Sequence, residues 1–251
     1  MGSLLLVALA GAACGVVNSI AGGGSLILFP TLLLTGMSPL SANVTNSVAT
    51  WPGYLGGVGA FRAEIGTRKH QLPWLLGATL AGSATGCVLL LVTPEDSFDV
   101  VVPWLVLVAT VMTALQPVVR KRLEDQDTAD ARPPMSAVTA IFLATIYGGY
   151  FGAALGVIVL AALSLTLNDT IKNLNATKSV ISLVDASVSV VVFGLFGPVE
   201  WQYVLVAAPT TLLGGYAGGR IARRIDEDLL RTLVVALGGT VTVLLFVRAF
   251  A

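Results

Sequence analysis

The apolar positions of this chain form continuous runs of about twenty residues, and they do not alternate with polar ones. These runs cover residues 72 to 92, 99 to 118, 172 to 196, 201 to 219 and 229 to 249. A helix rises 1.5 Å per residue, so about 20 residues cross the ~30 Å hydrocarbon core of a bilayer. A spanning strand would need only about ten residues of alternating polarity. The pattern therefore predicts membrane-spanning helices.

Each half of the chain opens with a segment that is too long for one crossing and too short for two comfortable ones, residues 3 to 35 and 135 to 167. In the first, the run Asn18-Ser-Ile-Ala-Gly-Gly-Gly-Ser25 interrupts the helix, because each Gly costs about 1 kcal/mol relative to Ala. The second is marked more weakly, by Gly148, Gly149, Gly152 and Gly156. We predict that each segment forms two short helices around a bend near the middle of the membrane, as a re-entrant hairpin or as an indented pair of spans.

The first bend is a candidate binding site. Interrupted backbone at membrane depth is tolerated only where it lines a cavity or is covered by protein. Helix packing alone does not need three consecutive glycines, so we predict a site at Asn18, Gly22, Gly23, Gly24 and Ser25. A helix that begins near Gly24 would direct its N-terminal amides and positive dipole end into this site, which favours an anion.

Close helix packing is the alternative role for glycine in this chain. We prefer it for Gly82-Ser-Ala-Thr-Gly86 and Gly215-Tyr-Ala-Gly-Gly219, because both have the small-xxx-small form of membrane helix interfaces.

Two polar patches repeat 132 positions apart, Asn43-Val-Thr-Asn-Ser-Val48 and Asn175-Ala-Thr-Lys-Ser-Val180. The match indicates an internal duplication, with chance similarity between two helices rich in Thr and Ser as the alternative. The patches offer amides and hydroxyls as ligands: Asn43, Thr45, Asn46, Ser47, Asn175, Thr177 and Ser179. Lys178 replaces Asn46 in the second copy and would give the site a positive charge, unless its long stem carries the charge to the cytoplasmic interface.

Asp185 is the only acid deep within a predicted span. It follows Lys178 by seven residues and so shares its helix face. Three roles fit it: an ion pair with Lys178, a proton that couples to anion movement, and a neutral, structural hydrogen bond.

Lys and Arg cluster in three connections, which predicts the topology by the positive-inside rule. Eleven of the fourteen lie within residues 62 to 69, 120 to 132 and 220 to 231, which we place in the cytoplasm. The intervening connections carry Glu95, Asp96, Asp99 and Glu200 and are placed outside, with Arg248 as the one exception. The run from residue 40 to 61 then starts outside and the matching run from 172 to 196 starts inside. The two copies are therefore inverted.

Together these patterns predict an all-α integral membrane protein of two inverted-topology repeats, each with about five helical segments, the first two short or re-entrant around a Gly bend. The first repeat covers residues 1 to 118 and the second residues 135 to 251, joined by a cytoplasmic linker at 119 to 134. The composition agrees, since 55% hydrophobic residues, 11% charged residues and a mean hydropathy of +0.87 do not suit a soluble core.

Composition and motifs also limit the function. The formal net charge of +0 gives no basis for nucleic-acid binding. The single histidine lies in a predicted connection, and the sequence has neither a metal-ligand cluster nor a nucleophile motif. We therefore expect no enzyme activity, no metal and no other cofactor.

The stretch Gly15-Val-Val-Asn-Ser-Ile-Ala-Gly-Gly-Gly-Ser-Leu-Ile-Leu-Phe-Pro30, followed by Gly36-Met-Ser-Pro-Leu-Ser-Ala-Asn-Val-Thr-Asn-Ser47, resembles the opening repeat of the sulfite exporter TauE/SafE family of membrane permeases. The second half resembles a diverged copy, in which Ala154-Leu-Gly-Val and Ala162 replace the Gly run and the Pro. The resemblance implies an inner-membrane carrier for sulfur-containing anions such as sulfite or organosulfonates. It also implies a binding region at Gly22, Gly23, Gly24, Thr45 and Thr177.

We therefore expect a multi-pass secondary transporter in the bacterial inner membrane that moves a small oxyanion through a midplane site between its repeats. A passive anion channel and a non-transporting scaffold subunit are the alternatives. The expected partners are the anion and the lipid bilayer, and a homo-oligomer remains open.

Overall fold

The computed structural model describes residues 2–20, 23–60, 70–121, 133–167, 169–221 and 227–250. All regular structure in these residues is helical, which confirms the predicted all-α class. The helices are α1 (Gly2–Ile20), α2 (Ser25–Leu34), α3 (Pro39–Ala60), α5 (Leu72–Val92), α6 (Glu95–Lys121), α7 (Met135–Tyr150), α8 (Leu155–Thr166), α9 (Ile171–Phe196), α10 (Trp201–Ile221) and α11 (Glu227–Phe250).

Five of these helices are long and apolar enough to cross a membrane: α1, α5, α6, α9 and α11. Three shorter apolar helices, α2, α7 and α8, belong to the two opening segments. The predicted run at residues 201 to 219 forms α10, which is not among the five. Several membrane crossings are thus present in the part of the chain that the structure describes.

Both opening segments are interrupted. Between α1 and α2, Gly23 has a φ of +84°, a left-handed conformation that glycine adopts without a steric penalty. Between α7 and α8, the left-handed residues are Gly152, with a φ of +75°, and Ala154, with a φ of +58°. Of the four glycines that mark this region in the sequence, only Gly152 lies in the break itself.

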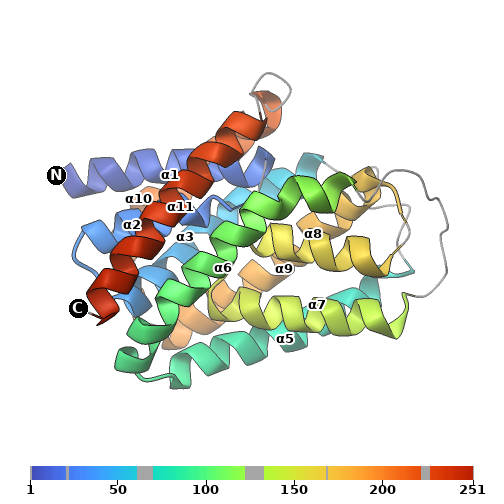
Figure 1. Cartoon of the computed structure of the whole chain (residues 1–251), viewed down its shortest axis with the longest axis horizontal. Coiled ribbons are helices and arrows are strands. Elements are labelled where there is room, and N and C mark those ends of the chain that lie inside the picture. The colour runs from blue at the N-terminus through green and yellow to red at the C-terminus, as the bar shows by residue number, and fades with distance from the viewer. Residues whose placement is uncertain are drawn as a thin grey trace.

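The two helix pairs around these breaks open toward opposite ends of the molecule. Figure 1 shows α1 running inward from the end at which both termini lie, and α2 returning toward that end. In the same view, α7 runs inward from the opposite end and α8 returns to it. The breaks therefore bring the beginnings of both short helices, α2 and α8, into the interior.

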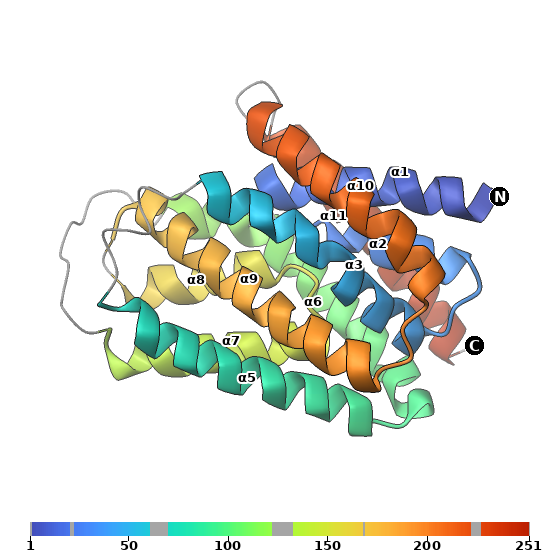
Figure 2. The ribbon, with the colours of Figure 1, turned by 180° about the vertical axis from the view of Figure 1, so that it is seen from behind.

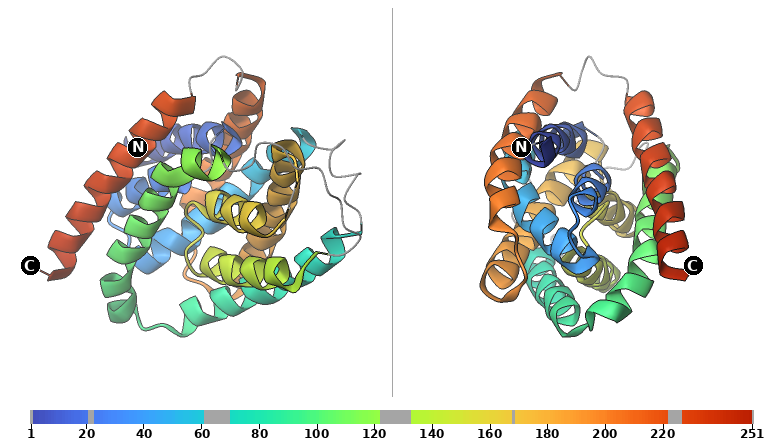
Figure 3. Two further views of the ribbon diagram at one scale, coloured as in Figure 1. Left: turned by 45° about the vertical axis from the view of Figure 1, so that its right-hand side comes forward. Right: turned by 90° about the vertical axis from the view of Figure 1, so that its left-hand side faces the viewer.

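The two halves exchange helix partners. α1 packs against α10, and α7 packs against α5. From behind, α10, α3, α9 and α5 follow one another in a layer, with α3 beside α9 in its middle (Figure 2). On the other side α6 pairs with α11 along one flank (Figure 3), and these helices contact the short helices α8 and α2, respectively.

Glycine allows the closest of these contacts. A Cβ added to Gly82 of α5 would stand 2.5 Å from the carbonyl oxygen of Phe142 in α7. A Cβ on Gly215 of α10 would stand 3.0 Å from the carbonyl oxygen of Gly53 in α3. These glycines serve helix packing, as their small-xxx-small spacing predicts.

Candidate functional site

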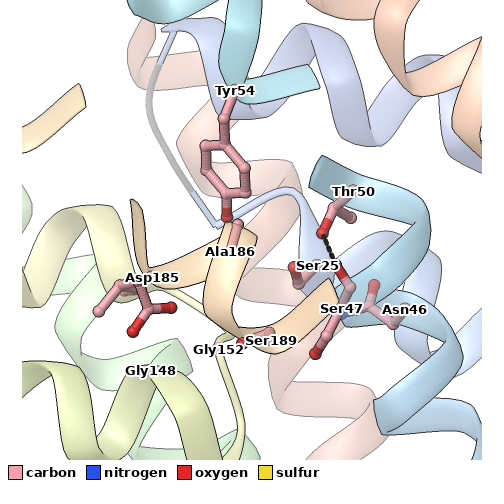
Figure 4. Close-up of a pocket in the computed structure, with 11 residues that line it drawn as sticks. Ser25, Asn46, Ser47, Thr50, Tyr54, Gly148, Gly152, Asp185, Ala186 and Ser189 are labelled. Carbon is pink, nitrogen blue, oxygen red and sulfur yellow. Dashed lines mark hydrogen bonds between the residues drawn. The ribbon is translucent and has the colours of Figure 1, made fainter. Parts of the chain in front are cut away.

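A cavity in the interior is lined by residues from both halves of the chain (Figure 4). Its walls are formed by the first residue of each short helix, α2 and α8, and by the middle of α3 and of α9. The lining residues are Ser25 of α2, Asn46, Ser47, Thr50 and Tyr54 of α3, Gly148 of α7, Gly152 in the second break, Leu155 of α8, and Asp185, Ala186 and Ser189 of α9.

The cavity is small in this conformation. The volume open to the centre of a water molecule inside the cavity is about 20 Å³, which is room for about one water. A ligand larger than a water molecule therefore does not fit unless the walls move.

The first polar patch contributes Asn46 and Ser47 to the cavity. Asn46 is 2% exposed, and its Oδ1 accepts no hydrogen bond from the described part of the chain. The Ser47 hydroxyl donates to the carbonyl oxygen of Asn43 at 2.9 Å, and the Thr50 hydroxyl donates to the carbonyl oxygen of Ser47 at 3.3 Å (Figure 4). A buried amide oxygen without a donor is costly, so the Asn46 Oδ1 is available to accept from a donor in the cavity, such as a water molecule.

The other half of this patch joins α3 to the second half of the chain. The Asn43 side-chain amide donates to the carbonyl oxygen of Tyr150, the last residue of α7, at 2.9 Å. The Thr45 hydroxyl accepts a hydrogen bond from the backbone amide of Glu200 at 3.0 Å, just before α10. Neither residue lines the cavity.

The second patch does not line the cavity. Thr177 is buried and Asn175 half-buried, and the Ser179 hydroxyl donates to the carbonyl oxygen of Asn175 at 2.8 Å. The stem of Lys178 lies beside α8, with its Cδ 3.7 Å from the point at which a Cβ on Gly156 would stand. The structure thus brings Asn46 and Ser47 of the first patch to the cavity, whereas α9 reaches the cavity with later residues, Asp185, Ala186 and Ser189.

The Gly bend supplies one lining residue. Ser25 is the first residue of α2 and lines the cavity. Asn18 closes the bend, since its Oδ1 accepts a hydrogen bond from the Gly24 amide at 2.8 Å. Gly23 and Gly24 are buried, whereas Gly22 lies outside the described residues.

Asp185 is held in the cavity wall by a residue that the sequence analysis did not select. Asp185 is 3% exposed. The Ser83 hydroxyl of α5 donates a hydrogen bond to the Asp185 Oδ1 at 2.5 Å. Gly148 makes room for this carboxyl, because a Cβ there would stand 2.6 Å from Oδ1. Of the three predicted roles, the structure places Asp185 in a short hydrogen bond with Ser83.

Tyr54, Thr50 and Ser189 are further lining residues that the sequence analysis did not single out. Helical spacing is the signal that points to them. Thr50 and Tyr54 follow Asn46 by four and eight residues, and Ser189 follows Asp185 by four, so each set lies on one helix face.

The lining residues include Asp185 as their one acid and no Lys or Arg. Positive potential comes instead from the backbone, because the cavity lies at the first residues of α2 and α8. Helix N-termini carry a partial positive charge and favour anions. In the described residues, no group of three or more His, Cys, Asp or Glu side chains is arranged to hold a metal ion.

The sequence profile of the family described as sulfite exporter TauE/SafE matches residues 7–245. The chain belongs to this family. The TauE/SafE resemblance of the Gly bend and the Thr-containing helix is thereby confirmed, and the chain is a multi-pass membrane transporter of this family.

Curated proteins similar to this chain carry general names. A "Probable membrane transporter protein" of Haemophilus influenzae is 26% identical over 228 residues, which cover 90% of this chain and 88% of the relative. The "Probable membrane transporter protein ORF9" of a Sinorhizobium species is 28% identical over 88% of this chain and 84% of its own. The "Probable membrane transporter protein YfcA" of Escherichia coli K12 is 25% identical over 96% and 88%, respectively. No solved structure matches the chain.

Proposed function

We propose that this chain is a secondary transporter that carries a small sulfur-containing oxyanion, such as sulfite or an alkylsulfonate, across the bacterial inner membrane. The principal support is the interior cavity, at which the first residues of α2 and α8 meet the polar faces of α3 and α9. Helix N-termini favour an anion, and the hydroxyls of Ser25 and Tyr54 are donors suited to its oxygens. Membership of a family of membrane transporters also supports this proposal.

We further propose that residues 1 to 118 and 135 to 251 are inverted repeats, with residues 119 to 134 as a cytoplasmic linker. The exchange of helix partners and the opposite opening of the hairpins α1–α2 and α7–α8 support this proposal (Figure 1). Rocking of such repeats around a central site gives alternating access.

The residues of the second patch are assigned a role in anion entry. Lys178 precedes Asp185 by seven residues, which is about 10 Å along α9 at 1.5 Å per residue. We propose that Lys178, with Asn175, Thr177 and Ser179, borders the path by which the anion reaches the cavity from the cytoplasm. Asn18, Gly23 and Gly24 hold the bend that positions Ser25, whereas Gly22 lies outside the described residues.

A thermal-stability screen of the purified protein tests substrate binding. Sulfite, sulfate, thiosulfate and methanesulfonate are compared with chloride at equal ionic strength. A ligand that binds only the folded state raises the unfolding temperature, so at least one sulfur oxyanion is expected to stabilise the protein beyond chloride. Equal behaviour of all five anions would contradict the proposed substrate class.

A pair of serine variants tests whether the cavity is the site. Ser25→Ala removes a hydroxyl from the lining, whereas Ser164→Ala removes a hydroxyl that donates to the carbonyl oxygen of Leu160 in α8, away from the lining. A hydrogen bond to an anion stabilises binding by about 1.5–3 kcal/mol, so Ser25→Ala is expected to weaken affinity about tenfold or more. Ser164→Ala is expected to bind as the native protein does, and equal losses would remove the cavity from the proposal.

Flux in proteoliposomes distinguishes a carrier from a passive anion channel and from a scaffold subunit. A carrier shows counterflow, in which an anion gradient drives exchange of labelled anion. A steady current under voltage would indicate a channel instead. Absence of both would favour a scaffold subunit, in which polar side chains only join helices.

A further inference from the structure

The cavity that we assign to an anion contains a buried carboxyl. Asp185 is 3% exposed and lines the same space as Ser25 at the beginning of α2. An ionised carboxylate would repel an anion in so small a volume, because like charges interact strongly where water is scarce. The charge of Asp185 therefore has to change or be balanced when the anion enters.

Among the residues that the structure describes, the side chains that face Asp185 do not supply a balancing charge. From α5 they are Ser83, which is fully buried, and Cys87. From α3 it is Tyr54, while α7 and α8 present Gly148 and Leu155. None of these groups is a cation. On α9 itself, Lys178 lies two helical turns away, with its stem beside Gly156.

Ser83 is able to serve Asp185 in either protonation state. Its hydroxyl donates to Oδ1 at 2.5 Å when the carboxyl is ionised, and a hydroxyl equally accepts from a neutral carboxylic acid. The contact does not have to break when Asp185 takes up or loses a proton. This is the behaviour required of a proton site that is emptied and refilled in each cycle.

We propose that Asp185 takes up one proton when the anion binds, and that proton and anion cross the membrane together. This proposal rests on the proposed transport of an oxyanion. The proton comes from water and binds the Asp185 carboxylate, and it leaves when the anion is released. With a monovalent anion the cavity carries one negative charge in both states, on Asp185 when empty and on the substrate when loaded. Transport is then an electroneutral proton–anion symport.

Proton uptake on binding gives the first test. The probe is methanesulfonate, which stays ionised over about pH 6 to 9, so that it takes up no proton itself. In weakly buffered detergent solution with a pH indicator, the native protein is expected to take up close to one proton per bound anion at the alkaline end of this range. Asp185→Asn, which keeps the shape and can accept from Ser83, is expected to take up none. Glu200→Gln removes an exposed acid before α10 and is expected to match the native protein.

Transport in proteoliposomes gives the second test. With an acidic exterior, the native protein is expected to accumulate labelled methanesulfonate above its equilibrium level. Asp185→Asn is expected to lose this accumulation while counterflow persists at a reduced rate. Accumulation by Asp185→Asn, or binding by the native protein without proton uptake, would overturn the proton proposal alone. Absence of both binding and counterflow in the native protein would overturn the transport function as well.

Ser83→Ala keeps the proposal testable if Asp185→Asn does not fold. This variant retains the carboxyl and removes the hydroxyl that bonds it. The pH at which proton uptake is half-maximal is expected to rise by about one unit, because the hydroxyl bonds the ionised carboxylate more strongly than the neutral acid. An unchanged midpoint would show that the proton is taken up elsewhere.

Discussion

At the scale of single residues, Ala154 in the second break adopts a backbone conformation that is unfavourable for alanine. Ala154 has a φ of +58°, and in the described residues no other non-glycine residue has a positive φ. A left-handed conformation costs a residue with a Cβ roughly 1–2 kcal/mol. Ala154 directly precedes Leu155, the first residue of α8 and part of the cavity wall. The turn that brings α8 to the cavity therefore carries this strain.

Ala154→Gly is expected to stabilise the protein by about 0.5–1 kcal/mol, because it relieves the strain at the expense of some chain entropy. The unfolding temperature in detergent should rise by about 2 °C. Ala153→Gly is the matched control, since Ala153 is equally buried but has no positive φ, and it is expected to lower the unfolding temperature. Equal changes in the two variants would contradict the strain at Ala154.

Thr45 separates a structural role from a binding role on the same helix. Thr45→Val keeps the shape but removes the acceptor of the Glu200 amide, and loss of this partly buried hydrogen bond costs about 0.5–1.5 kcal/mol. The variant is expected to unfold at lower temperature and to bind methanesulfonate within about twofold of the native affinity. A large loss of affinity at native stability would return Thr45 to the binding site.

At the scale of elements, glycines let pairs of helices from different halves approach closely. In α5, Gly86 faces the backbone of α7, and an added Cβ would stand 2.8 Å from the amide nitrogen of Tyr150. In α10, Gly214 faces the backbone of Ala12 in α1 in the same manner. Small residues of this kind drive association of helices in membranes, where apolar burial gives little.

Two glycines of α5 give a matched test of this interface. Gly86→Ala places a methyl group against α7 backbone and is expected to destabilise the protein by about 1–3 kcal/mol, as overpacking does. Gly77→Ala adds the same methyl group where no atom of another helix lies within 4 Å. It is expected to be neutral or to stabilise by up to about 1 kcal/mol through helix propensity. Thermal unfolding in detergent measures both, and a loss at Gly77 equal to that at Gly86 would refute the packing explanation.

At the scale of the whole molecule, Arg248 is the one exception to the predicted distribution of Lys and Arg. Arg248 in the last turn of α11 lines a second cavity together with Asp96 and Asp99 at the start of α6. The positive-inside rule counts Lys and Arg over all connections, so one arginine at this end does not outweigh the eleven in the three connections placed inside. The exception is thus consistent with the topology proposed from the sequence.

Single cysteines test the inverted topology. The native Cys14 and Cys87 are buried, so they are expected to react little with a membrane-impermeant maleimide. Pro94→Cys and Pro198→Cys lie in the exposed connections before α6 and α10, and Ser136→Cys lies on the exposed first turn of α7. We expect the first two to react from outside intact cells and the third only after the membrane is opened. Labelling of all three from the same side would contradict the inversion.

The sequence by itself determined the class of the protein and the position of its helices and breaks. Apolar runs, the Gly run before Ser25 and the clusters of Lys and Arg are local properties, and their physical consequences do not depend on distant residues. The same local pattern carries the family resemblance that the TauE/SafE profile confirms over residues 7–245. Small-residue spacing at Gly82 and Gly86 likewise predicted a packing role correctly.

Only the tertiary structure decided which polar residues share the cavity. Thr45 and Asn46 are neighbours in one motif, yet the first bonds the Glu200 backbone and the second lines the cavity. Asp185 meets Ser83, which lies 102 positions earlier, and no local pattern relates them. The reason is geometric: a helix side chain points where the rotation of its helix directs it, and that rotation is set by the partners it packs against.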